Sequence, residues 1–207
     1  MNAPNPSPLG AERRQRVLDA TRELMAEHGF RVSMDAVAQR AGCSKQTLYA
    51  QFGSKQALMQ ALMHEHLELT TSQLESFDGR LREPLLRFGL EHIERISEPG
   101  AVASLRLLSA EAPQYPDEAR SLWQEGAERL VSRVSDWLRQ AMDAGLLRHD
   151  QPHAAAELLL GMLVGLDADR QRFSLSQRDP AARRAWVEFA TDTFLKAFAP
   201  TSRMAAC

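Results

Sequence analysis

The sequence predicts an all-α protein, and three observations lead to that fold class. Strand signals are scarce, because the chain shows no sustained alternation of apolar and polar residues and few β-branched runs. Apolar residues instead recur every three or four positions over long segments, which is the periodicity of a half-buried helix. Proline and glycine fall between these segments, where helices begin and end. From this punctuation we expect about nine helices.

The first helix is expected from about Ala11 to His28. It ends at Gly29, and Phe30, just beyond it, is predicted to cap a small three-helix core. The residues of this helix that we expect to be buried are Val17, Ala20, Thr21, Leu24 and Met25.

Two short helices joined by a tight turn are expected between Ser33 and Phe52. In the first of them, residues 33–41, one apolar face consists of Met34, Val37, Ala38 and Ala41. Gly42 can adopt a positive φ without a Cβ penalty, so it suits the turn. Ser44 then serves as an N-cap for the second helix, in which Leu48 and Phe52 point into the core.

The other face of this second helix is left for solvent or a ligand, and its chemistry favours DNA. The hydroxyls of Thr47 and Tyr49 can donate to phosphate oxygens, and Lys45 supplies positive charge. Gln46 and Gln51 offer paired donor and acceptor groups to base edges in a major groove. The alternative is that these are ordinary polar residues on a solvated helix face.

A fourth helix is predicted from Ser54, its N-cap, to about Phe77. It carries Lys55 in its first turn, where orphan N–H groups favour an anion. At about 1.5 Å of rise per residue it spans roughly 30 to 35 Å, which makes it the link between two domains. Its apolar positions are Leu58, Leu62, Leu69 and Leu74.

Proline and glycine divide the rest of the chain into five further helical segments. We expect a helix-turn-helix DNA-binding domain over residues 10–70 and a helical ligand-binding and dimerisation domain over residues 71–200. The flanking residues 1–9, which hold three prolines and no apolar run, are predicted to be a disordered arm without a signal peptide, and residues 201–207 a tail. The five segments are residues 84–97, 101–111, 115–144, 152–172 and 180–198.

The segment AGCSKQTLYAQFGSKQAL, preceded by RRQRVLDATRELMAEHGF, resembles the N-terminal domain of the TetR family of bacterial transcriptional regulators, of AcrR/AefR-like type. The resemblance covers about residues 10–70 and is specific because many points match in register over one helical unit. The matching positions are Gly29-Phe30, Ala36-Val37-Ala38, Ala41-Gly42, Thr47-Leu48-Tyr49, Phe52 and Ser54-Lys55.

The resemblance implies a ligand-responsive regulator, most often a repressor, that binds a palindromic operator as a homodimer and is released by a small, largely apolar effector. It implies phosphate contacts by Thr47, Tyr49 and Lys55, and places Lys45, Gln46 and Gln51 near base edges. Gln46 and the Ala50-Gln51 pair depart from the family's common residues, which leaves the operator sequence open. The complete set of predicted DNA-binding residues is Ser33, Ser44, Lys45, Gln46, Thr47, Tyr49, Gln51 and Lys55.

Charge is distributed as this function requires. Residues 1–55 carry eight basic and five acidic side chains, a net charge of +3, whereas the whole chain has a net charge of −2 and the remainder therefore −5. A basic head on an acidic body is typical of a binding domain joined to a sensing domain.

A homodimer is expected through two apolar helices near the C-terminus. Gly161 and Gly165 stand four residues apart, and small residues at that spacing let two helices approach closely. We expect this helix and the last one to form a four-helix bundle with their symmetry mates. Such a dimer sets its two DNA-binding domains about 34 Å apart. The alternative is that both helices belong to the core of one chain and form no dimer interface. The predicted interface residues are Gly161, Gly165, Trp186, Phe189 and Phe194.

An effector site is expected between the C-terminal helices, where bundles commonly form apolar pockets. His92 and Arg106 are its candidate polar anchors, and each member of the set taken alone is more often a core residue than a pocket residue. The candidate pocket residues are Phe88, His92, Leu105, Arg106, Leu108, Trp123, Met162 and Leu166.

Other classes of protein fit less well. No nucleophile, phosphate-loop or metalloprotease motif is present, so we expect no enzyme, and neither metal nor cofactor. Cys43 and Cys207 provide no disulfide framework, which agrees with the reducing environment of the cytoplasm. A redox role for Cys43 is a remote alternative. The apolar stretch 154–166 contains Glu157 and is too short to cross a membrane. The remaining alternatives are an activator, or an adaptor that keeps the helix-turn-helix without an effector.

Overall fold

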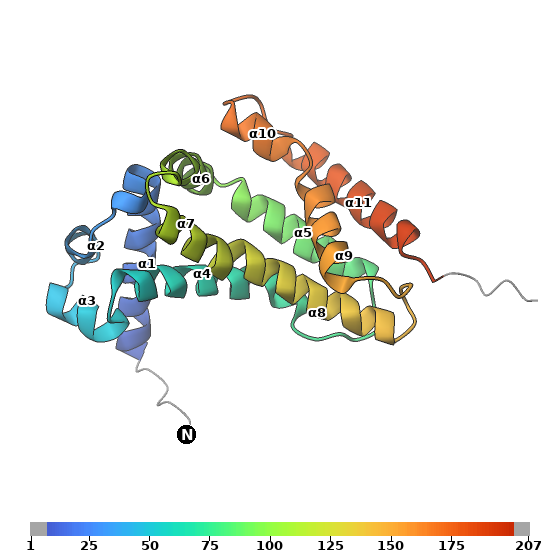
Figure 1. Cartoon of the computed structure of the whole chain (residues 1–207), viewed down its shortest axis with the longest axis horizontal. Coiled ribbons are helices and arrows are strands. Elements are labelled where there is room, and N and C mark those ends of the chain that lie inside the picture. The colour runs from blue at the N-terminus through green and yellow to red at the C-terminus, as the bar shows by residue number, and fades with distance from the viewer. Residues whose placement is uncertain (1–7, 201–207) are drawn as a thin grey trace, which may run out of the picture. The chain divides into compact units, whose positions relative to one another are not determined.

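The computed structural model describes residues 8–200, and for Pro8 and Leu9 the backbone alone. Within that range the chain is helical without strands, which confirms the predicted fold class (Figure 1). The predicted arm and tail lie outside the described residues, apart from Pro8 and Leu9, where α1 begins. The helices are α1 Pro8–His28, α2 Met34–Arg40, α3 Lys45–Phe52, α4 Lys55–Thr71, α5 Arg82–Ile96, α6 Pro99–Glu111, α7 Pro116–Trp123, α8 Arg129–Asp143, α9 Pro152–Val164, α10 Asp167–Arg172 and α11 Pro180–Ala197.

The described residues form two compact units. Unit 1 contains the chain up to His66 together with Pro99–Gly126, and unit 2 contains Leu67–Glu98 and the chain from Ala127 onward. Helices α6 and α7 therefore belong with the N-terminal helices, and α6 packs along α1. The predicted domains 10–70 and 71–200 are divisions of function, and as such they stay a prediction.

Unit 1 is built around α1. The five residues of α1 predicted to be buried are all buried, and Leu48, Phe52 and Phe30 join the same apolar cluster. Arg40 of α2 reaches back to α1, where it lies 3.1 Å from a carboxylate oxygen of Glu23 and 2.9 Å from one of Glu27. These hydrogen bonds raise the pKa of Arg40. They fix α2 on α1 from the solvent side, while the apolar cluster does so from within.

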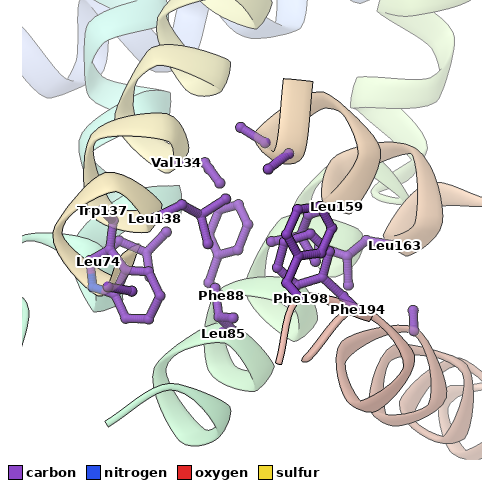
Figure 2. Close-up of a cluster of buried hydrophobic side chains, with 14 of the residues drawn as sticks. Leu74, Leu85, Phe88, Val134, Trp137, Leu138, Leu159, Leu163, Phe194 and Phe198 are labelled. Carbon is purple, nitrogen blue, oxygen red and sulfur yellow. The ribbon is translucent and has the colours of Figure 1, made fainter. Parts of the chain in front are cut away.

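Unit 2 has a separate core, in which α5, α8, α9 and α11 meet. Figure 2 shows Phe88 of α5 among side chains of the other three helices, with Leu138, Leu159 and Phe194 around it. All four are buried completely. Trp137 closes one side of this core, where its ring meets Phe77 edge-on at 5.2 Å between centroids.

The helix boundaries differ from the predicted ones where side chains compete for backbone groups. Helix α4 ends at Thr71, not near Phe77, and a 3₁₀ turn over Ser72–Leu74 follows. Thr71 Oγ1 donates to the carbonyl of Leu67 at 2.8 Å, and hydroxyls of this kind weaken the helical ladder. Leu69, predicted as apolar contact, is 47% exposed.

Two predicted long helices are also interrupted. The segment 115–144 contains a π-helical turn over Gln124–Glu128 between α7 and α8. The segment 152–172 breaks at Gly165, whose φ of +53° ends α9. A residue with a Cβ rarely adopts that φ, so glycine is required there.

Truncation of Leu159 in the unit 2 core tests the packing. Leu159→Ala removes a side chain with no exposed surface, so we expect a loss of about 2 to 5 kcal/mol in the free energy of unfolding. Urea denaturation followed by circular dichroism measures it. Leu166→Ala, at a position 64% exposed, is the control and should change stability by less than about 0.5 kcal/mol. Equal losses in both variants would contradict the described core.

Candidate nucleic-acid interface

The turn and caps that position α3 are formed by short-range contacts. Gly42 has φ of +66°, and Gly53, with φ of +76°, ends the helix. Ser44 has an extended backbone, and its Oγ accepts from the N–H of Thr47 at 3.0 Å. The same Oγ lies 2.8 Å from Thr47 Oγ1. The predicted N-cap is thus present, and it also fixes the Thr47 side chain.

Helix α3 has one buried and one exposed side. Leu48 is completely buried and Phe52 is 8% exposed. The residues on the opposite side keep their solvent contact, and Thr47 is half-buried between the two sides. The exposed residues of α3 are Lys45, Gln46, Tyr49, Ala50 and Gln51.

Ser33 and Lys45 join α2 to this surface. Ser33 caps α2 by accepting from the N–H of Ala36 at 3.1 Å, so it lies at a helix N-terminus and remains exposed. The ammonium of Lys45 lies 2.7 Å from a carboxylate oxygen of Asp35 in the first turn of α2. Hydrogen bonding to Asp35 raises the pKa of Lys45, so its charge is secure near neutral pH.

Lys55 occupies a different position from that expected of a phosphate ligand. It is half-buried, and its Nζ donates to the backbone carbonyl of Phe30 at 2.5 Å. Ser54, beside it, caps α4 as predicted by accepting from the N–H of Ala57 at 3.1 Å. A phosphate contact by Lys55 stays a prediction, and it requires the ammonium to exchange the Phe30 carbonyl for the phosphate.

Arg14 was not singled out from the sequence, although it lies in the basic run RRQR. Its guanidinium lies over the ring of Phe52, 5.1 Å from the centroid. The N-terminal part of α1 is thereby held beside the end of α3. Arg13 and Arg16, in the same two turns of α1, are exposed.

Glu111 of α6 was also missed. It is 8% exposed, it accepts from the N–H of Phe30 at 2.9 Å, and it lies 2.9 Å from Arg31 Nε. A Cβ on Gly29 would overlap the Glu111 side chain, and Gly29 also has a positive φ. No short-range pattern predicts a carboxylate 81 residues away from its donor.

The predicted effector residues divide between the two units, so their assembly into one site stays a prediction. Phe88 and His92 stack in unit 2 with ring centroids 5.8 Å apart, close to parallel. In the same unit Met162 is half-buried and Leu166 exposed. The remaining four lie in unit 1, where Leu108 is a core residue and the other three are exposed. Those three are Leu105, Arg106 and Trp123.

Three of the predicted dimer residues have internal partners. Trp186 packs its ring over Gly165, and its Nε1 donates to the carbonyls of Met162 and Leu163 at 3.1 and 3.0 Å. Phe194 is completely buried in the unit 2 core, so it cannot also present a surface to a partner. Gly165 and Trp186 are half-buried, so their placement at an intermolecular seam stays a prediction, whereas Phe194 has no exposed surface to offer there.

Gly161 and Phe189 lie on the surface. Gly161 is exposed, with no atom within 4 Å of the position a Cβ would take, and Phe189 is 62% exposed. Gly161 can therefore accept a close neighbour from outside the chain.

The exposed polar side of α3, backed by two buried residues and preceded by α2 and a glycine turn, defines a helix-turn-helix DNA-binding protein. Residues 17–62 match the family model described as bacterial regulatory proteins, tetR family. Residues 83–200 match the AefR-like transcriptional repressor, C-terminal domain. The chain belongs to the TetR family of transcriptional regulators.

Several relatives support this assignment. The regulator UidR of Escherichia coli K12 is 29% identical over 173 residues, which are 79% of this chain and 84% of UidR. The activator FasR of Mycolicibacterium smegmatis is 27% identical over 183 residues, 86% of this chain and 78% of FasR. The structure of the flavonoid-responsive regulator FrrA is 30% identical with a TM-score of 0.70, and the match covers 93% of this chain and all of FrrA. These relatives are named as regulators and not as enzymes.

Residues 8–200 lack two further kinds of feature. None of the helices there has the length and apolar character that a bilayer crossing requires. No group of three or more histidine, cysteine or acidic side chains in that range could hold a metal ion. Cys43, half-buried beside the turn, has a free thiol.

The N-cap of α3 can be tested separately from any role in DNA binding. Ser44→Ala removes the side-chain acceptor for the Thr47 N–H, so we expect about 1 kcal/mol of destabilisation. Ser44→Asn retains an acceptor at the cap, and its free energy of unfolding should lie within a few tenths of a kcal/mol of that of the natural protein. Thermal denaturation of the three proteins gives the comparison. If Asn and Ala destabilise equally, Ser44 is not an N-cap.

Proposed function

We propose that this protein is a transcriptional repressor that binds a palindromic operator as a homodimer and is released by a small-molecule effector. The exposed polar side of α3, fixed from behind by Leu48 and Phe52, is the observation that carries the proposal. A helix supported in this way fits a major groove while its polar side chains remain available. Since its ligand is chromosomal DNA, the protein acts in the cytoplasm.

The roles follow from the chemistry of each side chain. Thr47 and Tyr49 donate their hydroxyls to phosphates, and Ser33 and Ser44 lie at helix N-termini, where backbone N–H groups also favour phosphate. Gln46 and Gln51 read base edges. Lys45 adds charge near the groove, and Lys55 acts after exchanging its Phe30 contact. Arg14 of α1, whose guanidinium lies beside the end of α3, is an additional phosphate ligand.

Repression is the preferred outcome, because the C-terminal family is described as a repressor domain and spans more than half of the chain. Activation is the second candidate, and its support is the similarity to FasR, which is named an activator. An adaptor that keeps the fold without reading DNA has less support, because the polar side of α3 is uncovered.

An exposed apolar surface on unit 2 supports the homodimer. Leu158 and Gly161 of α9 lie three residues apart and are both exposed, with Leu158 50% exposed. On α11, Ala185 and Phe189 are exposed one turn apart. Apolar surface of this kind favours association. An isologous dimer would then set two α3 helices one turn of duplex apart.

An effector that prefers one arrangement of the helices would change operator affinity by about 1 to 3 kcal/mol. FrrA, which this chain resembles over its length, is named a flavonoid-responsive regulator. A small, largely apolar effector is therefore a reasonable class for this protein as well.

Two substitutions on α3 test the DNA contacts. Sequencing of DNA fragments selected from a random pool by the purified protein first identifies the operator. Thr47→Ala removes a phosphate donor and should weaken binding to every sequence alike, by roughly tenfold. Gln46→Ala should instead relax the preference at one base position, worth about 1 to 3 kcal/mol. Fluorescence anisotropy at several salt concentrations measures both, and affinity should fall steeply as salt rises.

Operator binding that stays unchanged in both variants would show that α3 does not face the DNA. Gln140→Ala, on α8 in unit 2, is a matched control and should bind the operator as the natural protein does. A single protein bound to a site without two-fold symmetry would contradict the proposed palindrome.

Charge placed in the α9 and α11 surface tests the dimer. Phe189→Glu puts a carboxylate where the proposed interface is apolar, so we expect monomers in place of dimers. Size-exclusion chromatography with light scattering at micromolar protein measures the mass. Leu69→Glu, at an exposed position of α4 away from this surface, should leave the dimer intact. A monomeric natural protein would overturn the proposal.

A further inference from the structure

A cavity in unit 1 lies beside the first turns of α4, the helix that follows α3, and contains none of the predicted effector residues. Its volume is about 360 Å³, which is within the usual range for small-ligand sites. One side is formed by α4 and Phe30, and the other by α7 and the π-helical turn after it. The residues that line it are Phe30, Lys55, Gln56, Met59, Gln60, Met63, Asp117, Glu118, Ser121, Leu122 and Glu125.

The apolar part of the cavity is adaptable. Met59 and Met63 contribute flexible, polarisable side chains, and Leu122 lies on the α7 side. Phe30 adds an aromatic ring, which is held in place by Tyr115 at 5.8 Å between ring centroids. Such a surface accepts an apolar body of variable shape.

The polar part of the cavity is acidic. Asp117, Glu118 and Glu125 contribute three carboxylates, against the single ammonium of Lys55. Lys55 already donates to the Phe30 carbonyl. Arg120 bonds Asp117 at 2.9 Å from outside the lining, and Gln60 donates to Glu125 at 3.3 Å across the cavity. Carboxylates that line a cavity favour a cation, because their charges attract it.

We propose that this cavity binds a small organic cation with an apolar body, and that the bound cation changes the affinity of the protein for DNA. Binding of the cation depends on the cavity alone and not on any DNA contact. The coupling rests on the proposed function, because it requires that α3 read an operator.

Coupling follows from the elements that the ligand would touch. Phe30 is held through its N–H by Glu111 of α6 and through its carbonyl by Lys55 of α4. Lys55 is the first residue of α4, and only Gly53 and Ser54 separate it from the end of α3. A ligand that displaces Phe30 or α4 therefore acts on the segment that follows α3.

The test uses the full chain and benzyltrimethylammonium as the probe. Its permanent charge removes pH as a variable, and neopentylbenzene is the neutral analogue with carbon in place of nitrogen. Isothermal titration calorimetry should show saturable binding of the cation, and at least tenfold weaker binding of the neutral analogue. Phenylacetate, an anion of similar size, should not bind.

Two variants locate the site. Glu118→Gln with Glu125→Gln removes two cavity charges and should weaken cation binding at least tenfold. Glu12→Gln with Asp143→Asn changes the net charge equally at exposed positions that do not line the cavity and should bind as the natural protein does. Ser121→Phe fills the cavity and should abolish binding, and thermal denaturation verifies that each variant is folded.

The outcomes separate the two proposals. Equal affinity for the cation and its neutral analogue, or unchanged binding in the Glu118/Glu125 variant, would overturn the cation site. If the cation binds in this cavity but the protein selects no operator from the DNA pool, the cation site stands and the proposed function is rejected. If the protein binds both the cation and an operator, saturating cation should change operator affinity about 5- to 150-fold in the natural protein and not in the Ser121→Phe variant. An unchanged operator affinity in the natural protein would overturn the coupling.

Discussion

The burial of Leu48 and Phe52 is the constraint on which the exposed polar side of α3 depends. The two side chains lie one turn apart on α3, so burying both fixes the rotation of that helix about its axis. The rotation of α3 then decides which of its other side chains face the core and which face solvent. Arg14 extends this arrangement, because its guanidinium lies over Phe52 at the edge of the core. The polar surface is therefore a consequence of packing behind it.

A second constraint acts on the backbone of Phe30. A buried N–H and carbonyl are costly without partners, and here Glu111 supplies the acceptor and Lys55 the donor. The two partners come from α6 and α4, so one residue joins helices that are distant in sequence. Gly29 is needed beside it, because any Cβ there would meet Glu111. This explains why residues 99–126 belong to the unit that contains the helix-turn-helix.

The local part of this structure could be predicted from sequence, and the long-range part could not. Ser33, Ser44 and Ser54 cap helices through contacts three residues away, so short patterns reveal them. Glu111 reads as a surface residue until its partner 81 positions away is known. Gly165 looked like half of a helix-packing pair, yet it ends α9 beneath Trp186. In each such case the deciding atom lies in another helix, and periodicity carries no information about it.

If the protein binds an operator as proposed, the pairing of the two lysines near α3 bears on how it distinguishes that operator from other DNA. Nonspecific affinity comes from cations that neutralise phosphates, and Lys45 and Lys55 already have an acidic and a carbonyl partner within the chain. Phosphate must compete with Asp35 for the Lys45 ammonium, which reduces the gain from any stretch of duplex. The base contacts proposed for Gln46 and Gln51 would involve no such exchange, because their side chains are exposed. Internal pairing of these cations would then lower nonspecific affinity more than specific affinity, and it is the ratio of the two that a regulator needs.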